Sequence, residues 1–212
     1  SMNASSPSLI DAKRYIMQTP WNLIYTYDIE DAKQYGWRWL GYSYFSSYFP
    51  HNVNSNMQTD AYFIGAFKGG REQLILDVAK EMQLHDVNYK FDILSKEKHI
   101  STKSVKFHNK YIKYHRIQPF ISNTNCIIEI LQQNQHCQSY RFFEAVYYNK
   151  KLITNNHNII NYPFYDQRHM KIFDTPDQID YDWIKEKENI QYGYQNEFSP
   201  INLLNMIKSD IL

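Results

Sequence analysis

The sequence predicts an α/β fold with a mostly parallel sheet covered by helices on both faces, a Rossmann-like architecture. From residue 61 onward, short apolar runs alternate with longer amphipathic stretches, as in successive βαβ units. The chain of 212 residues is 43% hydrophobic and 21% charged, close to the average of folded globular proteins. No internal repeat or low-complexity tract interrupts this pattern.

The expected strands are short and apolar, and cover residues 22–27, 62–67, 89–94, 108–112, 126–131, 151–154 and 170–173. The expected helices are amphipathic, and cover residues 8–18, 71–83, 139–149, 180–187 and 201–211, with another beginning near Pro119. Asp28 opens a short helical segment or turn that ends at Gly36, and Ser139 and Ser199 are suitable N-caps. The polar stretch 50–60 is interpreted as a loop or linker.

Charge and cysteine content argue against several classes. A formal net charge of +1 gives no global field that would gather nucleic acid. The densest basic run, 103–116, is better explained as a solvated surface than as a binding stripe, so we expect no nucleic-acid partner. Two cysteines cannot form the disulfide framework of a small secreted domain, and the His and Cys residues lack metal-ligand spacing. We therefore expect no metal. No cofactor loop is visible either, so we expect no cofactor.

No apolar run has the length of a membrane span, and the N-terminal residues lack the layout of a signal peptide. The expected compartment is the cytoplasm. Peripheral attachment to the inner face of the membrane stays open.

A glycine-rich loop, FIGAFKGGRE, follows the first strand of the alternating region. Gly65, Gly69 and Gly70 allow close approach to the backbone, and Lys68 and Arg71 place cations beside the free N–H groups of the next helix. This arrangement favours a phosphate, although a plain glycine turn explains the same residues.

A second loop, QQNQHCQSY, leads from strand 126–131 into helix 139–149. It contains no Gly or Pro that would explain its length as a turn, and it delivers amide side chains to the edge of the sheet where ligands bind. Ser139 can cap the helix. Arg141 and Glu144 share a helix face, which salt bridging explains as well as ligand binding does.

Two further features are weaker. Asn155, Asn156 and His157 follow strand 151–154, and they either bind a ligand or end the strand as turn formers. Cys137 lies in the second loop, but the spacing implies no histidine that would activate it as a nucleophile.

The run CIIEILQQNQHCQSYRFFEAVYYNKKLITNN resembles a signature of bacterial glycosyltransferases of capsule, lipopolysaccharide and exopolysaccharide synthesis. In that group a strand is followed by a Gln/Gly-rich loop, an Arg-x-x-Glu-Ala helix start and a Lys-Lys-Leu-Ile-Thr-x-Asn strand. The segments YTYDIEDAKQYG, YFIGAFKGGREQLI, YIKYHRI and IINYPFYDQRHMKIFD fall in the order that the group has them. The resemblance spans about residues 22–175.

The resemblance implies a GT-B enzyme, in which two Rossmann-like domains flank a cleft, no metal is obligatory and the C-terminal domain holds the nucleotide-sugar donor. Glu144 would hydrogen-bond the ribose, and the helix start at Ser139 and Tyr140 would receive the diphosphate. Lys68 and Arg71 would stabilise the leaving group as the glycosidic bond breaks. The donor-binding residues implied in this way are Gly65, Lys68, Arg71, Lys113, Ser139, Tyr140, Arg141 and Glu144, with Gln135, His136 and Gln138 as candidates for contacting the sugar.

The chain departs from the group's pattern in the second loop. Retaining relatives have a glutamate eight positions before the helix glutamate, where this chain has His136, and His136, Cys137 and Gln138 replace the usual loop glycines. The stereochemical outcome, the donor and the catalytic residues therefore stay open.

In the group, the segment YTYDIEDAKQYG closes the N-terminal domain. We therefore expect residues 1–50 to be a remnant of the acceptor domain with its connecting segment, and residues 61–212 to be the donor domain. The expected function is transfer of a sugar from a nucleotide-sugar donor to a glycan or lipid-linked acceptor, with this chain supplying mainly donor binding. The alternative is a non-catalytic Rossmann-like module that binds a partner protein through the aromatic segment 37–49.

Overall fold

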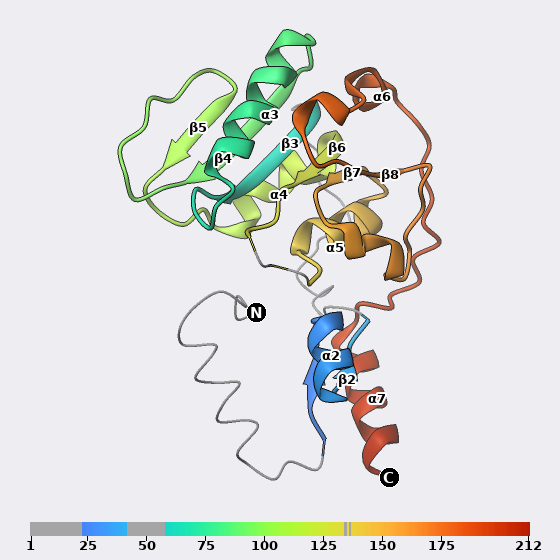
Figure 1. Cartoon of the computed structure of the whole chain (residues 1–212). Helices are drawn as coiled ribbons and strands as arrows, with labels where there is room; N and C mark the ends of the chain where they lie inside the picture. Colours follow the sequence, from blue (N-terminus) through green and yellow to red (C-terminus); the bar gives the residue numbers. More distant parts are fainter. Residues whose placement is uncertain (1–22, 42–57, 134, 136) are drawn as a thin grey trace.

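A computed structural model of the chain describes residues 23–41, 58–133, 135 and 137–212 (Figure 1). The expected helix over 8–18 lies outside the described residues. So does most of the aromatic segment 37–49 and of the loop 50–60.

The centre of the protein is a six-stranded sheet in which every pair of neighbouring strands is parallel. Its strands are β3 (Thr59–Ala66), β4 (Tyr89–Leu94), β5 (Val105–His108), β6 (Thr124–Glu129), β7 (Lys151–Thr154) and β8 (Met170–Ile172). They lie in the order β5-β4-β3-β6-β7-β8 (Figure 1). Counted from β3, this is the 3-2-1-4-5-6 order of doubly wound dinucleotide-binding sheets. The predicted Rossmann-like fold class is confirmed.

Helices cover both faces of the sheet because successive strand residues point to opposite sides. Tyr62 and Ile127 pack against α4 (Tyr114–Asn123) and α5 (Tyr140–Tyr148) on one face. Their neighbours Phe63 and Ile128 pack on the other face against α3 (Glu72–Leu84) and α6 (Tyr181–Lys185). Two short 3-10 segments, η2 (His157–Asn161) and η3 (Pro176–Gln178), lie between the later elements.

Local chemistry explains where the helices begin and end. Ser139 caps α5, since its Oγ accepts the N–H of Arg141 at 3.0 Å, and Asn149 ends the helix in the left-handed conformation with φ of 52°. Ser199 caps α7 (Pro200–Ile211) by accepting the N–H of Ile201 at 3.3 Å, with Pro200 in the first turn. Both predicted N-caps are confirmed.

Several predicted bounds are displaced by a few residues, and the differences at β5 and α4 have a clear physical reason. The strand expected over 108–112 is β5, which covers Val105–His108, because Val105 and Phe107 alternate toward the core under α3 while residues 109–111 are exposed. The helix expected to begin near Pro119 is α4, which begins at Tyr114 and contains Pro119. Burial of its apolar face against the sheet outweighs the N–H that proline lacks.

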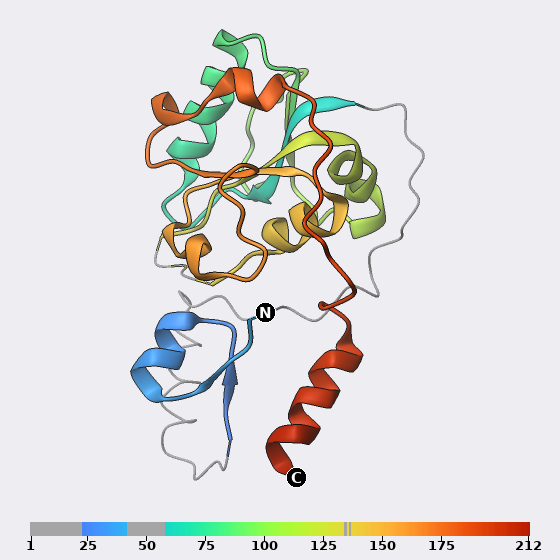
Figure 2. The same ribbon diagram turned by 90° about the vertical axis from the view of Figure 1, so that its right-hand side faces the viewer.

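A second, smaller part of the chain lies beyond the sheet (Figures 1 and 2). It consists of the parallel strands β1 (Tyr25–Thr26) and β2 (Arg38–Trp39), joined by α2 (Ile29–Tyr35). Asp28 caps α2 and Gly36 ends it, so the expected short helix is confirmed, whereas the strand expected over 22–27 covers only β1 in the described residues.

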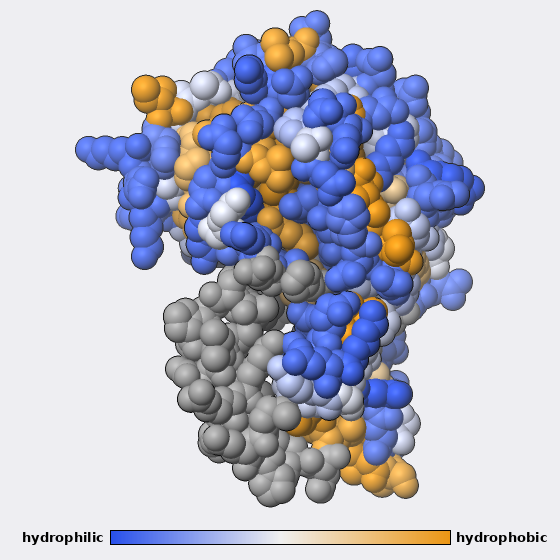
Figure 3. All heavy atoms as spheres, viewed as in Figure 1, coloured by the Kyte–Doolittle hydropathy of each residue, from blue (hydrophilic) through white to orange (hydrophobic). Residues whose placement is uncertain are grey.

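Helix α7 joins this smaller part rather than the sheet. The hydroxyl of Tyr25 donates to Asp210 Oδ2 at 2.9 Å, and Arg38 Nη2 lies 3.5 Å from Asp210 Oδ1. No residue of α7 is buried, and Ile201 and Leu204 are exposed. On the face shown in Figure 3, hydrophilic residues otherwise cover most of the surface. Within the described residues, no helix combines the length and apolar character needed to cross a bilayer.

Candidate functional site

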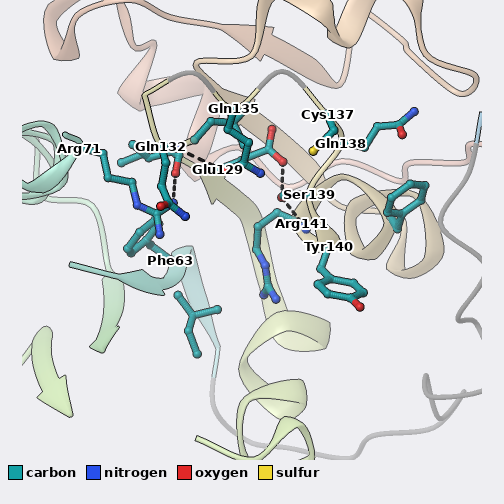
Figure 4. A pocket seen from close by; sticks show the side chains of 14 residues that line it. Phe63, Arg71, Glu129, Gln132, Gln135, Cys137, Gln138, Ser139, Tyr140 and Arg141 are labelled. Carbon is teal, nitrogen blue, oxygen red and sulfur yellow. Dashed lines mark hydrogen bonds between the residues drawn. The ribbon is translucent and has the colours of Figure 1, made fainter. Parts of the chain in front are cut away.

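The direction of the strand order reverses between β3 and β6. The chain leaves β3 toward β4 on one side, and it returns through α4 to β6 on the other. In doubly wound sheets the loops after two such strands diverge and open a crevice in which ligands bind. A pocket of about 240 Å³ lies at this point, between the ends of β3 and β6 and the first turn of α5 (Figure 4).

Arg71 forms one wall of the pocket and bridges the two strand ends. Its Nε and Nη2 donate to the carbonyl oxygen of Ala66 at 3.1 and 3.0 Å, and its Nη1 donates to the carbonyl oxygen of Ile130. A Cβ at Gly65 would lie 2.9 Å from Arg71 Nη2, so the glycine leaves room for the guanidinium. Burial lowers the pKa of Arg71 to about 10. The side chain therefore stays charged at neutral pH.

The glycine-rich loop docks on the loop after β6. Gly69 and Gly70 have φ of +79° and +78°, and a Cβ on either would collide with the side chain of Gln132 or Gln133. The N–H of Gln133 also donates to the carbonyl oxygen of Gly69 at 2.7 Å. The glycines therefore serve contact between the two loops, while Lys68 is exposed and does not line the pocket.

The pocket also contains a carboxyl group that the sequence analysis did not single out. Glu129 ends β6 and is 2% exposed. Its Oε1 accepts a hydrogen bond from Ser139 Oγ (Figure 4), and its Oε2 accepts one from Thr154 Oγ1. Burial raises the pKa of Glu129, against the lowering effects of both hydroxyls, the Ser139 backbone and the charge of Arg141. A lone acidic residue within the apolar run CIIEIL is the sequence feature that marks it.

The side chain of Glu144, a residue of α5, is buried and does not line the pocket. Its carboxyl is fully buried, and its Oε2 lies 2.6 Å from Nη1 of Arg141. Burial raises the pKa of Glu144 to about 7, even though the charge of Arg141 and the hydroxyl of Tyr114 lower it. Arg141 itself lines the pocket. It therefore connects the buried carboxyl to the site.

The remaining predicted residues divide between two places. Gln135, Gln138, Ser139 and Tyr140 line the same pocket as Arg71 and Arg141. Gln138 is buried and donates from Nε2 to the carbonyl oxygen of Gly41 at 3.0 Å, whereas Tyr140 is half exposed at the rim. His136 lies outside the described residues. Lys113 borders a different cleft.

This second cleft of about 980 Å³ lies between β4, β5 and α4. Within the described connection 95–104 no helix crosses from β4 to β5. The floor of the cleft holds the buried Asp92, whose oxygens contact His108 Nε2 at 2.7 Å, the Tyr62 hydroxyl at 2.9 Å and Lys90 Nζ at 3.2 Å. The cations that line the cleft are Lys90, Lys96, Lys98, Lys110, Lys113 and Arg116.

The polar residues that follow β7 make hydrogen bonds within the protein. Asn155 Oδ1 accepts the N–H of Leu131 at 2.7 Å, Asn156 caps η2, and His157 Nε2 lies 2.6 Å from Asp174. These contacts favour the turn interpretation. Cys137 lines the pocket, but burial raises the pKa of its thiol, the opposite of what a thiolate nucleophile needs.

Comparison of the chain with protein-family models, with curated proteins and with solved structures finds no match. The fold and the site define its class: a Rossmann-like α/β protein with a pocket at the switch point of its parallel sheet.

Proposed function

We propose that this chain binds a nucleotide-sugar donor and supplies the donor-binding part of a glycosyltransferase that acts in surface-glycan synthesis. The observation that carries the proposal is the pocket between β3 and β6, where Arg71, Arg141 and the N-terminus of α5 come together. A helix N-terminus presents free N–H groups and partial positive charge, and guanidinium groups bind phosphate oxygens through paired hydrogen bonds. A diphosphate suits this combination.

The lining of the pocket favours a sugar beside the diphosphate. Gln132, Gln135 and Gln138 bring side-chain amides to it, and an amide can both donate to and accept from a sugar hydroxyl. The loop after β3 lacks the GxGxxG pattern of a dinucleotide site. By the resemblance to glycosyltransferases, the backbone at 112–114 would border the base, so the nucleoside would extend toward the cleft that Lys113 lines.

The proposed chemistry concerns the leaving group. As the glycosidic bond of the donor breaks, negative charge grows on the diphosphate, and Arg71, Arg141 and the first turn of α5 would stabilise it. The proposal assigns no acceptor site and no catalytic base to the described residues. Those groups would come from the part of the enzyme that holds the glycan or lipid-linked acceptor.

Calorimetric titration with UDP, GDP and ADP and with their glucose or mannose conjugates tests the proposal. We expect saturable binding of one nucleotide and of its sugar conjugate. Arg71→Ala should weaken this binding at least about tenfold, because it removes a charged phosphate contact. Arg168→Ala, at an exposed arginine paired with Asp166, should leave it unchanged. Absence of both heat and thermal stabilisation with every ligand would overturn the proposal.

A further inference from the structure

We propose that binding of the donor diphosphate takes up a proton at Glu129, so that the affinity of the pocket is controlled by the protonation of this carboxyl group. The inference rests on the proposed function in one respect: the ligand must bring a diphosphate to the start of α5. The resemblance assigns no role to this residue.

The carboxyl of Glu129 lies at the start of α5. Its carboxyl accepts hydrogen bonds from the hydroxyl and the backbone of Ser139, the residue that caps α5. The start of a helix attracts an anion, and here the protein places its own acidic group there. Figure 4 shows Glu129 and Ser139 pointing toward one another inside the pocket. A bound diphosphate would therefore meet a carboxylate at the same helix N-terminus.

The surrounding cations do not neutralise this carboxyl through a direct ion pair. Among the described residues, the hydrogen-bond partners of Glu129 are hydroxyl and backbone groups. Arg141 is held by Glu144 at 2.6 Å, and Arg71 donates to neutral carbonyl oxygens. An ionised Glu129 would thus be a carboxylate without a direct ion pair among the described residues, placed where the diphosphate would bind.

The other titratable groups around Glu129 do not remove the conflict. Glu144 on α5 is itself acidic and supplies no positive charge. Burial raises the pKa of the Cys137 thiol and that of the Tyr162 hydroxyl, so these two groups stay neutral near pH 7. Arg71 and Arg141 are the cations that act on Glu129.

The site can hold the protonated form of Glu129 if only the hydrogen of a neighbouring hydroxyl group turns. A hydroxyl group both donates and accepts, so Ser139 Oγ or Thr154 Oγ1 can rotate to accept a hydrogen bond from the neutral carboxyl. Burial already raises the pKa of Glu129 in the free protein, and a neighbouring anion raises the pKa of a carboxyl further. Proton uptake at this group therefore removes repulsion between like charges in a site of low dielectric.

The sign of the pH dependence follows from linkage. Binding favours the protonated form, so affinity is highest below the pKa of Glu129 in the free protein. It falls as the pH rises toward the higher pKa of the complex, and above that it is constant. Because one proton is involved, the dissociation constant rises by at most about tenfold per pH unit in that window.

The test is calorimetry of the wild-type chain with UDP-glucose and GDP-mannose. Their diphosphates are doubly substituted and gain no proton near neutral pH. Titrations between about pH 5 and about pH 9, in buffers of different ionisation enthalpy, count the protons taken up. We expect measurable uptake of no more than one proton, with its maximum between the pKa values of Glu129 in the free protein and in the complex. Glu129→Gln should abolish it, flatten the pH dependence and bind more tightly than wild type at high pH. Glu81→Gln, on α3 away from the pocket, should behave as wild type.

The possible outcomes distinguish failure of this inference from failure of the proposed function. Wild-type binding without proton uptake across this range overturns the inference and leaves the proposed function standing. Uptake that persists in Glu129→Gln also overturns it, because another group then takes the proton. If Glu129→Gln does not fold, infrared difference spectra of the Glu144→Gln complex decide, since binding must then produce a protonated-carboxyl band to which Glu144 does not contribute. Absence of any binding by wild type overturns the proposed function and this inference together.

Discussion

Arg141 and Glu144 form an ion pair one helical turn apart, in which the carboxyl is fully buried and the guanidinium reaches the pocket. The pair therefore couples a charge beneath α5 to the site at its start. A buried carboxylate is costly when its partner is removed, and the pKa of Glu144, raised to about 7 by burial, places the change of charge near neutral pH.

Glu144→Gln should change how stability depends on pH. The folded-state pKa of about 7 lies well above the ordinary value of a glutamate in an unfolded chain, about 4.3, so the stability contributed by Glu144 is fully present below that ordinary value. It is lost as the pH rises through about 7. Between these limits the wild type should lose about 3 kcal/mol relative to Glu144→Gln. Urea unfolding of both proteins at several pH values measures this, and parallel curves would contradict it.

Arg71→Lys should weaken the contact between the two loops and also weaken nucleotide binding, although it keeps the positive charge. Lysine cannot reproduce the fork that donates to Ala66 and Ile130. We expect a loss of about 1–3 kcal/mol in the free energy of unfolding, together with weaker nucleotide binding. Lys33→Arg, on the exposed surface of α2, is the control for the exchange of the two cations. Unchanged unfolding of Arg71→Lys would show that the bridge contributes little.

Gly69→Ala should be more destabilising than a change in backbone conformation alone explains. Gly69 and Gly36 both have positive φ, but a Cβ at Gly69 would lie 2.5 Å from Gln132 Oε1, whereas at Gly36 nothing lies within 4 Å. Gly36→Ala should cost about 1–2 kcal/mol from the left-handed conformation, and Gly69→Ala more, with weaker ligand binding as the loops separate. Equal losses in thermal unfolding would refute the proposed docking of the two loops.

Lys151→Met should destabilise the chain strongly. Lys151 is 1% exposed, and its Nζ donates to the carbonyl oxygens of Trp183 and Glu186 at 2.6 and 2.8 Å and lies 3.1 Å from Glu188 Oε1. Removing it leaves buried acceptors unpaired, at about 3–5 kcal/mol. Lys171→Met is a matched control, because Lys171 also lies over the Trp183 ring but is partly exposed. Its loss should stay within about 1 kcal/mol.

The bounds of a strand can be predicted from the sequence where polar turn residues follow its apolar run. The sequence predicts β4 and β7 with their observed bounds, because apolar runs stop at polar turn residues. The caps Ser139 and Ser199 are local hydrogen-bonding features, and they too are predictable. The run containing β5 and α4 is different. Which apolar residues pack there depends on α3 and the sheet, and tertiary burial outweighs the preference for placing Pro119 in a first turn.

The candidate site divides in a similar way. The sequence brings Arg71, Ser139 and Arg141 forward because each stands at a helix start after a strand. It cannot show that Gly69 is needed for contact with Gln132, since that contact joins two loops far apart in sequence. Nor does spacing along the chain bring Glu129 to Thr154, because only the parallel pairing of β6 and β7 does so.

The parallel pairing of β3 with β6 also determines when the pocket can form. Thr59 and Thr124 are partners at the start of this pairing and stand 65 residues apart in the sequence. Closing so long a stretch of chain is entropically costly and slow compared with forming a helix or a hairpin. A chain emerging from the ribosome therefore has no pocket until β6 and the start of α5 have been synthesised and β6 has joined β3, and acquisition of the proposed ligand affinity during synthesis would report that pairing.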